Sequence, residues 1–519
     1  MRTKNSIINI LFAVFSYIIL FFGPFFVIPF IKNYIGTDVL GLEKTFIDVV
    51  YFARLGTIYG VYKLYKPIAN NDIPKITVFL SFYKKLLTFA AFFVISLGFI
   101  FIPFVPQIVR TVDSSKLLLN PQIIFLLYVL DVALTYLFGH KRAMIIADQK
   151  NYITVLCRVV CRVLMYSFQA FVVYFFRSFS LYVIIKVFST FLESIFINLY
   201  YKKFYGHIPT KTDLKMLESD KLDLFRTLKA VLCHKYSYEA IFSGTVLIMT
   251  GFLSATVTGM YYPYAQIASG LITINAHVFN AVVSSFGNYL VEKKPSEAYQ
   301  IYKKIYFFNF WIFSFFSTVI ICVSSIFVSI WVGIDSLLPL KTIVLIAIYF
   351  YFLGMRQSIA MAKSSAGLFQ PDKYFAILEP ILNIFLAWLF VGELGINGIL
   401  LANIATSFLI PFWTQPYLVY KNIFKKSCIF YYKKYIMYFL LMAFECTLSC
   451  FMCSFFVKCD IYLRLFFNMF ICLILPNLIN YFIFKNTDEF NYLKNLLLKI
   501  IKNKFFIKLK GERNAFEKK

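Results

Sequence analysis

Seven charged residues interrupt long apolar stretches of this 519-residue sequence: Arg54, Arg158, Arg162, Arg356, Asp131, Glu193 and Glu379. An ionisable side chain deep in a membrane-spanning helix costs at least ~2.5 kcal/mol on insertion scales, so such residues usually serve a function. A guanidinium group binds a phosphate through two parallel hydrogen bonds. The surplus of arginine over acid therefore predicts a substrate-binding site for an anion, with the three acids as charge partners.

The spacing of Arg158 and Arg162 supports this prediction. Because they are four residues apart, both side chains project from one face of a helix and repel each other unless an anion lies near. At ~1.5 Å per residue, Arg162 lies about 16 Å from the inner end of its segment, and Glu193 lies about 13 Å from the inner end of the next. We expect Glu193 to balance one of the two arginines, and Glu379 to face Arg356. The alternatives are snorkelling of Arg158 and Arg356 toward the headgroups, and purely structural salt bridges.

The elements that carry these residues are apolar segments long enough to cross a bilayer. Hydrophobic residues make up 60% of the chain and aromatic residues 20%, and the mean hydropathy of +0.74 is far outside soluble usage. A membrane span needs about 20 apolar residues. We count fourteen such segments: 7–31, 40–62, 77–103, 121–139, 151–176, 179–201, 236–258, 262–290, 301–330, 339–362, 374–392, 395–419, 432–457 and 461–484. The sequence therefore predicts an all-α polytopic membrane protein.

Basic residues alternate between the connections and so predict an orientation. With the N-terminus inside, each expected inner connection carries two or more Lys or Arg, and each outer connection carries no more than two. This pattern places both termini in the cytoplasm. It also accounts for much of the net charge of +27, which removes the main support for nucleic-acid binding. Basic inner loops favour anionic lipid headgroups instead.

The longest inner connection divides the chain. Its charged residues and leucines alternate with helical spacing, which indicates a cytoplasmic amphipathic linker helix at the membrane surface. Six spans precede it and eight follow it. We therefore expect two six-helix lobes around a central cavity, then two additional transmembrane helices and a basic cytoplasmic tail. In chain order, the lobe, linker, second lobe, helix pair and tail occupy residues 1–201, 202–235, 236–420, 432–484 and 485–519.

The sequence lacks the common motifs of enzyme chemistry. It has no GxxxxGK[ST] phosphate loop, no HExxH and only four histidines, so we expect no enzyme activity, no cofactor and no metal. Cys446, Cys450 and Cys453 have the CxxxCxxC spacing of a cluster-binding loop, but they lie in a helix-length apolar run. We assign them to packing, because buried cysteines usually behave as small apolar residues.

Three stretches carry a resemblance to a known family. They are ARLGTIYGVYKLYKPIANNDIPKI at 53–76, FNAVVSSFGNYLVEKKPSEAYQIYKKIYFFNFW at 279–311, and GMRQSIAMAKSSAGLFQPDKYFAILEPILN at 354–383, the last followed by Gly395–Gly398 and Gln415–Tyr417. With them the chain resembles the polysaccharide or O-antigen flippases (Wzx type) of the multidrug/oligosaccharidyl-lipid/polysaccharide (MOP) exporter superfamily, over roughly residues 4 to 426. The resemblance implies two helical bundles around a central cavity that opens alternately to either side.

The resemblance also implies a substrate and a location. The substrate would be an oligosaccharide linked through pyrophosphate to a polyprenyl lipid, moved from the inner to the outer leaflet of a bacterial cytoplasmic membrane. A proton or sodium gradient is expected to drive the transport. Arg54 stands where the family pattern has an acid before Leu-Gly, and Thr250 and Gly251 stand where relatives carry Asp-Asn, so the coupling residues stay open. The alternatives are a cation-coupled multidrug exporter, a membrane polysaccharide polymerase and a non-transporting scaffold.

Overall fold

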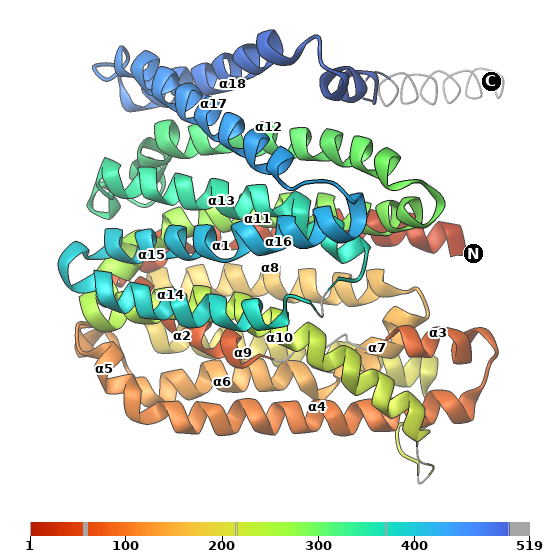
Figure 1. Cartoon of the computed structure of the whole chain (residues 1–519). Coiled ribbons are helices and arrows are strands. Elements are labelled where there is room, and N and C mark those ends of the chain that lie inside the picture. The colour runs from red at the N-terminus through yellow and green to blue at the C-terminus, as the bar shows by residue number, and fades with distance from the viewer. Residues whose placement is uncertain are drawn as a thin grey trace, which may run out of the picture. The chain divides into compact units, whose positions relative to one another are not determined.

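The computed structural model describes residues 2–54, 61–212, 214, 216–368, 371–496 and 498 (Figure 1). Within this part of the chain all regular structure is helical and no strand occurs, which confirms the predicted all-α fold. The α-helices are α1 (Arg2–Tyr34), α2 (Thr37–Ala53), α3 (Tyr62–Ala69), α4 (Ile73–Phe101), α5 (Val105–Val109), α6 (Pro121–Leu137), α7 (Gly139–Ala147), α8 (Asn151–Phe176), α9 (Phe179–Tyr205), α10 (Glu218–Ile248), α11 (Ala255–Glu292), α12 (Pro295–Trp331), α13 (Leu340–Ser365), α14 (Lys373–Leu394), α15 (Ile396–Leu409), α16 (Pro411–Val419), α17 (Ile429–Ser454) and α18 (Ile461–Phe484). The π-helical turn Met249–Leu253 joins α10 to α11, and a second one, Tyr420–Phe424, follows α16.

The helices account for the predicted spans. Eleven helical segments among the described residues are long and apolar enough to cross a membrane, and the bent pair of α6 and α7 makes a twelfth. The two remaining predicted spans, 40–62 and 236–258, overlap α2 and α10. Neither helix is long and apolar enough to count as a membrane span by itself. α2 has only 17 residues, and the first half of α10 is polar. Within the described residues, each of the fourteen predicted segments overlaps a helix, and the protein is a multi-pass membrane protein.

The helices group into two compact units, which are described separately. Unit 1 comprises Met1–Ala265, Ser329–Leu337 and Ala376–Ala402, and unit 2 comprises Gln266–Val328, Leu338–Phe375 and Asn403–Lys519. This division follows packing and not chain order, so it differs from the lobes expected from the sequence.

The predicted linker, residues 202–235, is part of unit 1. Its first residues continue α9 to Tyr205, and its last ones belong to α10, which begins at Glu218 and runs to Ile248. α10 packs along α2. At the other end of the chain, residues 499–519 of the predicted basic tail lie outside the described residues.

Prolines inside the helices of unit 1 free carbonyl groups that other helices satisfy. Pro29 lacks the N–H that would bond to Phe25, and the Trp331 indole donates to the Phe25 carbonyl instead, at 2.7 Å. Likewise, the carbonyl that Pro380 frees on α14 accepts a hydrogen bond from the Ser237 hydroxyl of α10. Both contacts tie together segments that are far apart in the sequence.

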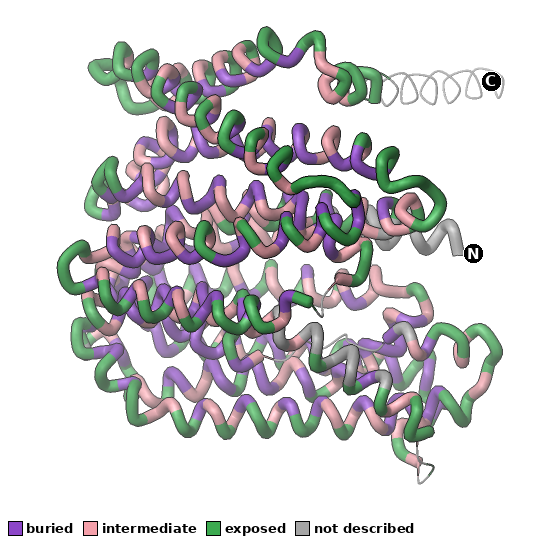
Figure 2. The backbone as a smooth tube through the Cα atoms, in the orientation of Figure 1, coloured by how far each residue is buried: buried purple, intermediate pink, exposed green. Residues whose placement is uncertain are grey.

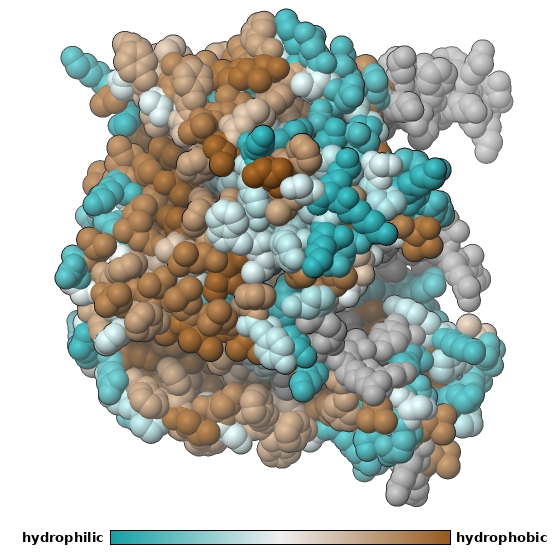
Figure 3. Space-filling view, in the orientation of Figure 1, coloured by the Kyte–Doolittle hydropathy of each residue, from teal (hydrophilic) through white to brown (hydrophobic). Residues whose placement is uncertain are grey.

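The outward faces of unit 1 carry side chains suited to lipid. Along α4 and α14, buried and exposed residues alternate (Figure 2), and many of the exposed ones are large and apolar. Phe89, Phe92 and Phe99 project from α4, and Phe385 and Trp388 project from α14. The space-filling view shows hydrophobic side chains gathered over the middle of α14 (Figure 3). Such a surface is stable only against hydrocarbon.

Unit 2 joins the last two helices to α12. Phe310 of α12 stacks on Tyr438 of α17 with 4.1 Å between the ring centroids. The Trp311 indole of α12 donates to the side-chain oxygen of Asn477 on α18 at 2.6 Å. The two helices that the sequence predicted as an addition to the lobes are therefore attached by specific aromatic and polar contacts.

Candidate functional site

The helices α8 and α9 form an antiparallel pair that carries Arg158, Arg162 and Glu193. The turn between them needs only two residues, because Arg177 adopts a left-handed conformation (φ 47°) and the Ser178 hydroxyl caps α9 by accepting from the Leu181 N–H. Further along, the Ser189 hydroxyl of α9 donates to the Cys161 carbonyl of α8 at 3.0 Å. These bonds fix the register in which Arg158 and Arg162 of α8 face α9.

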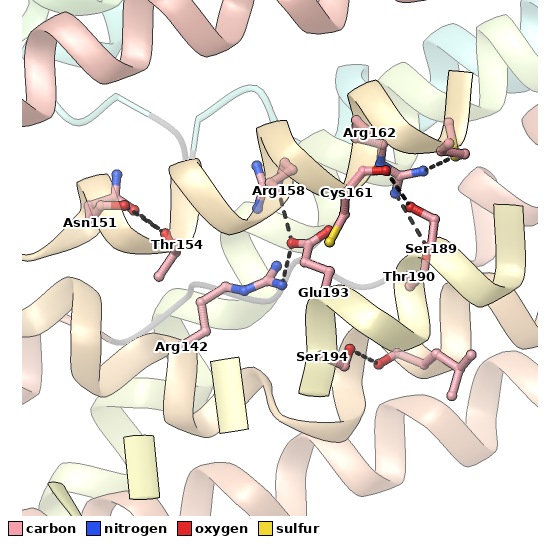
Figure 4. A network of polar contacts seen from close by, with 12 residues as sticks. Arg142, Asn151, Thr154, Arg158, Cys161, Arg162, Ser189, Thr190, Glu193 and Ser194 are labelled. Carbon is pink, nitrogen blue, oxygen red and sulfur yellow. Dashed lines mark hydrogen bonds and ion pairs between the residues drawn. The ribbon is translucent and has the colours of Figure 1, made fainter. Parts of the chain in front are cut away.

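Glu193 of α9 is the centre of the site. Its carboxylate accepts a hydrogen bond from Arg142 Nη2 at 2.7 Å and lies 3.5 Å from Arg158 Nε (Figure 4). Glu193 is 4% exposed and Arg142 is 7% exposed, so this ion pair is buried. The Arg158 side chain is 36% exposed and makes the longer, weaker contact. Arg158 is therefore the member of the group that a ligand can reach most easily.

Arg162 is connected to a second carboxylate through a hydroxyl. Its Nη2 donates to Thr190 Oγ1 at 3.4 Å, and the Thr190 hydroxyl donates to Asp131 Oδ1 at 2.5 Å. Its Nη1 lies 3.1 Å from the sulfur of Met165. Because Thr190 precedes Glu193 by three residues on α9, both branches of the network lie on one face of that helix (Figure 4).

The network carries more positive than negative charge. It holds three guanidinium groups, those of Arg142, Arg158 and Arg162, against two carboxylates. The charge of Arg54, at the C-terminal end of α2, also acts on Arg142. In addition, Arg142 Nε is buried and has no acceptor within the described part of the chain. A buried donor without a partner and a positive surplus both favour a bound anion.

The structure places Glu193 between two arginines, one of them outside the predicted set. Glu193, expected to balance Arg158 or Arg162, lies 3.5 Å from Arg158 Nε. The predicted spans 121–139 and 151–176 leave Arg142 in the connection between them, whereas in the structure the chain bends by 45° after α6 and continues as α7 with Arg142 buried. The apolar run Ala143–Ala147 directly after Arg142 was the signal that this segment is not a solvated loop.

The predicted partners Arg356 and Glu379 belong to different units. Arg356 of α13 donates to the side-chain oxygen of Gln415 at 2.9 and 3.0 Å when that amide is oriented toward it. Beside it lies a small cavity of about 20 Å³, lined by Tyr431 and Tyr435 among others, which is room for about one water molecule. Glu379 is buried on α14 of unit 1. Their pairing stays a prediction.

Buried carboxylates on α2 were missed by the sequence analysis. Glu43 accepts a hydrogen bond from the Tyr182 hydroxyl at 2.5 Å, and the charge of Lys186 acts on it. Asp48, one turn further on, accepts from Lys44 at 2.7 Å. Both acids are buried. The signal was present, since Glu43, Lys44 and Asp48 all lie inside the predicted span 40–62.

No family model and no curated protein matches the sequence. Solved structures do match its fold. The lipid II flippase MurJ in an inward closed conformation superposes with a TM-score of 0.60 at 13% sequence identity, covering 92% of this chain and 99% of MurJ. An inward-facing multidrug resistance MATE transporter of the MOP superfamily gives a TM-score of 0.57 at 12% identity, covering 81% and 99%. A variant of the MATE transporter VcmN from Vibrio cholerae gives 0.53 at 12%, covering 82% and 100%.

These matches define the class of fold. The chain is a multi-pass membrane protein with the fold of MOP-superfamily transporters, and almost the whole of each matched structure is covered. Within that class, its fold is similar both to a lipid II flippase and to multidrug exporters.

Proposed function

We propose that this protein is a Wzx-type flippase of the MOP superfamily. It moves an oligosaccharide linked to polyprenyl pyrophosphate from the inner to the outer leaflet of the bacterial cytoplasmic membrane by alternating access, for surface polysaccharide biosynthesis. The observation that carries the proposal is the cluster of buried Arg142 with part-buried Arg158 and Arg162, which has more positive than negative charge and a buried donor without an acceptor among the described residues. In this proposal, the N-terminus and the basic connections face the cytoplasm.

The cluster suits a pyrophosphate because its members are held with unequal strength. Arg142 is fixed to Glu193 by a short bond, whereas Arg158 makes only the longer contact and is partly exposed. A phosphate group that approaches Arg158 replaces its weak contact with Glu193 by a bidentate contact with two phosphate oxygens. Arg142 Nε then gains an acceptor, and Arg162 adds charge from one turn further along α8. Arg54 is placed to contribute through its charge, which acts on Arg142. Arg356, in unit 2, stays a predicted substrate-binding residue.

An apolar cavity in unit 1 supports a lipid-linked substrate. It has a volume of about 290 Å³ and lies among α2, α4, α6, α10 and α14. Its lining is almost wholly apolar and includes Phe52, Ala53, Leu97, Phe101, Leu247 and Ile384. Apolar cavities of this kind stay dry and accept hydrocarbon. On α2 the lining ends at Ala53, beside Arg54, so a hydrocarbon chain and a charged headgroup would bind at neighbouring positions.

The second candidate function is a cation-coupled multidrug exporter. The similar TM-scores of the MurJ and MATE structures support it as well as the flippase. The specific observation in its favour is the pair of buried acids on α2, Glu43 and Asp48, since buried carboxylates can exchange a proton or bind sodium. The same acids would serve to couple a flippase to a proton or sodium gradient.

Arg158→Gln tests the proposed function. Loss of a hydrogen-bonded charge to the pyrophosphate costs ~1.5–3 kcal/mol, so we expect translocation to fall about 10- to 150-fold at low substrate. The measurement is the initial rate at which a labelled polyprenyl-pyrophosphate saccharide crosses proteoliposome membranes. The control is Arg177→Gln, at the exposed end of the same helix. Equal rates for the two variants, or efflux of cationic dyes in place of lipid transport, would contradict the flippase.

Ala240→Phe tests the role of the apolar cavity. Ala240 of α10 lines the cavity, so a phenyl ring there occupies space that a hydrocarbon chain would fill. Exclusion of two methylene groups costs ~1.6 kcal/mol, so we expect about tenfold weaker binding of a long-chain substrate. A short-chain analogue should bind the variant and the original protein alike. Tyr238→Trp, at an exposed position of the same helix, is the control for added volume. Equal binding of the long chain would rule out this role.

A further inference from the structure

Four cysteines from three helices of unit 2 lie close together. Cys322 lies on α12, Cys450 and Cys453 lie on α17, and Cys472 lies on α18. The sulfur atoms of Cys322, Cys453 and Cys472 all lie within 4.8 Å of one another. The Cys450 sulfur lies 3.3 Å from that of Cys322 and stands just outside the set of three that are all close to one another. Cys453 and Cys472 are buried.

The four cysteines that lie together in the structure are not the three of the CxxxCxxC spacing seen in the sequence. Cys450 and Cys453 are three residues apart on α17 and so share a face. Cys446, the first member of the CxxxCxxC spacing, contacts the Thr318 hydroxyl at 3.3 Å and the Met442 sulfur at 3.6 Å. It therefore keeps the packing role that the sequence analysis gave to all three. The other two positions of the set come from α12 and α18.

We propose that these four cysteines bind a Zn²⁺ ion. Zinc prefers four thiolate ligands in a tetrahedron with Zn–S distances of ~2.3 Å, which places the sulfur atoms roughly 3.8 Å apart. The Cys322–Cys450 separation is 3.3 Å and the sulfur atoms of Cys322, Cys453 and Cys472 lie within 4.8 Å of one another, so small side-chain shifts would bring the four to this spacing. With four protein ligands the site is closed, which is typical of structural and not catalytic zinc.

The surroundings of the cluster fit an anionic metal centre. Binding of Zn²⁺ displaces the four thiol protons and leaves the centre with two negative charges, which needs compensation in an apolar environment. The charge of Arg464 of α18 acts on the Cys453 sulfur, and its Nε is buried with no acceptor among the described residues. The Asn468 amide donates to the Cys322 carbonyl at 2.9 Å and so fixes the backbone at one ligand.

A disulfide explains the arrangement less well. One disulfide bond joins two sulfur atoms at ~2.05 Å and leaves two thiols over, and two disulfide bonds would join the four cysteines only in pairs. A zinc ion uses all four and links α17 and α18 to α12. The metal would act as a clamp for the last two helices, at the end of α17 where the chain turns into α18.

The test is the metal content of the purified full-length protein. We expect about one zinc per chain by elemental mass spectrometry after purification without chelator, and Cys453→Ser and Cys322→Ser should each lose most of it. Cys459→Ser, exposed and outside the cluster, and Cys157→Ser on α8 should retain it. Replacement by Co²⁺ alone should give the sulfur-to-metal absorption bands of a tetrahedral thiolate site.

Two outcomes would overturn the zinc site even if the cluster variants fail to fold. One is original protein that contains no zinc and binds no Co²⁺ after reduction. The other is a mass loss of two hydrogens per pair of cysteines in denatured, alkylated protein, which would show disulfide bonds. Removal of the metal by a chelator should lower the unfolding temperature, and added Zn²⁺ should restore it.

Discussion

Replacing Glu193 with Gln is expected to destabilise the folded protein by about 3 to 5 kcal/mol, because the substitution leaves the buried Arg142 guanidinium without its carboxylate. Glutamine has nearly the same shape, so the loss comes from charge and not from packing. Arg158 cannot compensate for the lost carboxylate, since it carries the same positive charge as Arg142. The measurement is thermal unfolding in detergent, followed by intrinsic tryptophan fluorescence.

Two variants control this prediction. Arg158→Gln alters the same carboxylate's other contact, but Arg158 is partly exposed and its contact is long, so its effect on stability should be within about 1 kcal/mol. The double variant Arg142→Gln with Glu193→Gln removes both charges and should recover much of the stability lost in the single variant. If the Glu193→Gln and Arg158→Gln variants unfold at the same temperature, the Arg142–Glu193 pair does not stabilise the protein more than the Arg158–Glu193 contact does.

The part of the site on α8 and α9 follows from the sequence because it depends on regular geometry. The spacing of four residues puts Arg158 and Arg162 on one face, and the short turn to α9 fixes the depth of Glu193 opposite them. Arg142 could not be placed in this way, because depth counting assumes a straight helix and the chain bends between α6 and α7.

Contacts made by uncharged groups also could not be predicted from the sequence. Thr190 joins Arg162 to Asp131, but a threonine inside an apolar run looks like any other helix residue. The cysteine cluster is a stronger case, since Cys322 is 128 residues from its neighbour Cys450. Only the packing of α12 against α17 and α18 brings such groups together, and one sequence carries no signal for that packing.

The departures from the family pattern redirect the search for coupling residues. Thr250, one of the two residues at which the resemblance led us to expect Asp-Asn, contacts the hydroxyls of Thr45 at 2.7 Å and Thr258 at 2.8 Å. Buried acids of this region of unit 1 are found instead on α2, at Glu43 and Asp48. At 12 to 13% identity, site residues cannot be transferred from the matched structures, so the assignment depends on the chemistry of this chain.

The threonine contacts depend on a close approach of α2 to α11, which leads to the second large expected effect. A Cβ atom at Gly41 would overlap the backbone carbonyl of Ala255 and the amide of Gly259. Small residues at crossings of this kind allow membrane helices to pack backbone to backbone. Because backbone atoms cannot rotate away as a side chain can, Gly41→Ala should cost about 3 kcal/mol or more, the upper end of overpacking effects.

Gly392→Ala is the matched comparison, since its added methyl group meets no atom within 4 Å. That glycine lies inside α14, where alanine is the better helix former by about 1 kcal/mol, so the variant should be as stable as the original protein or slightly more so. Both variants are compared by unfolding temperature and by the fraction of protein that stays monodisperse in detergent. If Gly41→Ala is as stable as Gly392→Ala, the two helices do not meet at Gly41. The hydroxyl contacts of Thr45 would then need a different arrangement of α2 and α11.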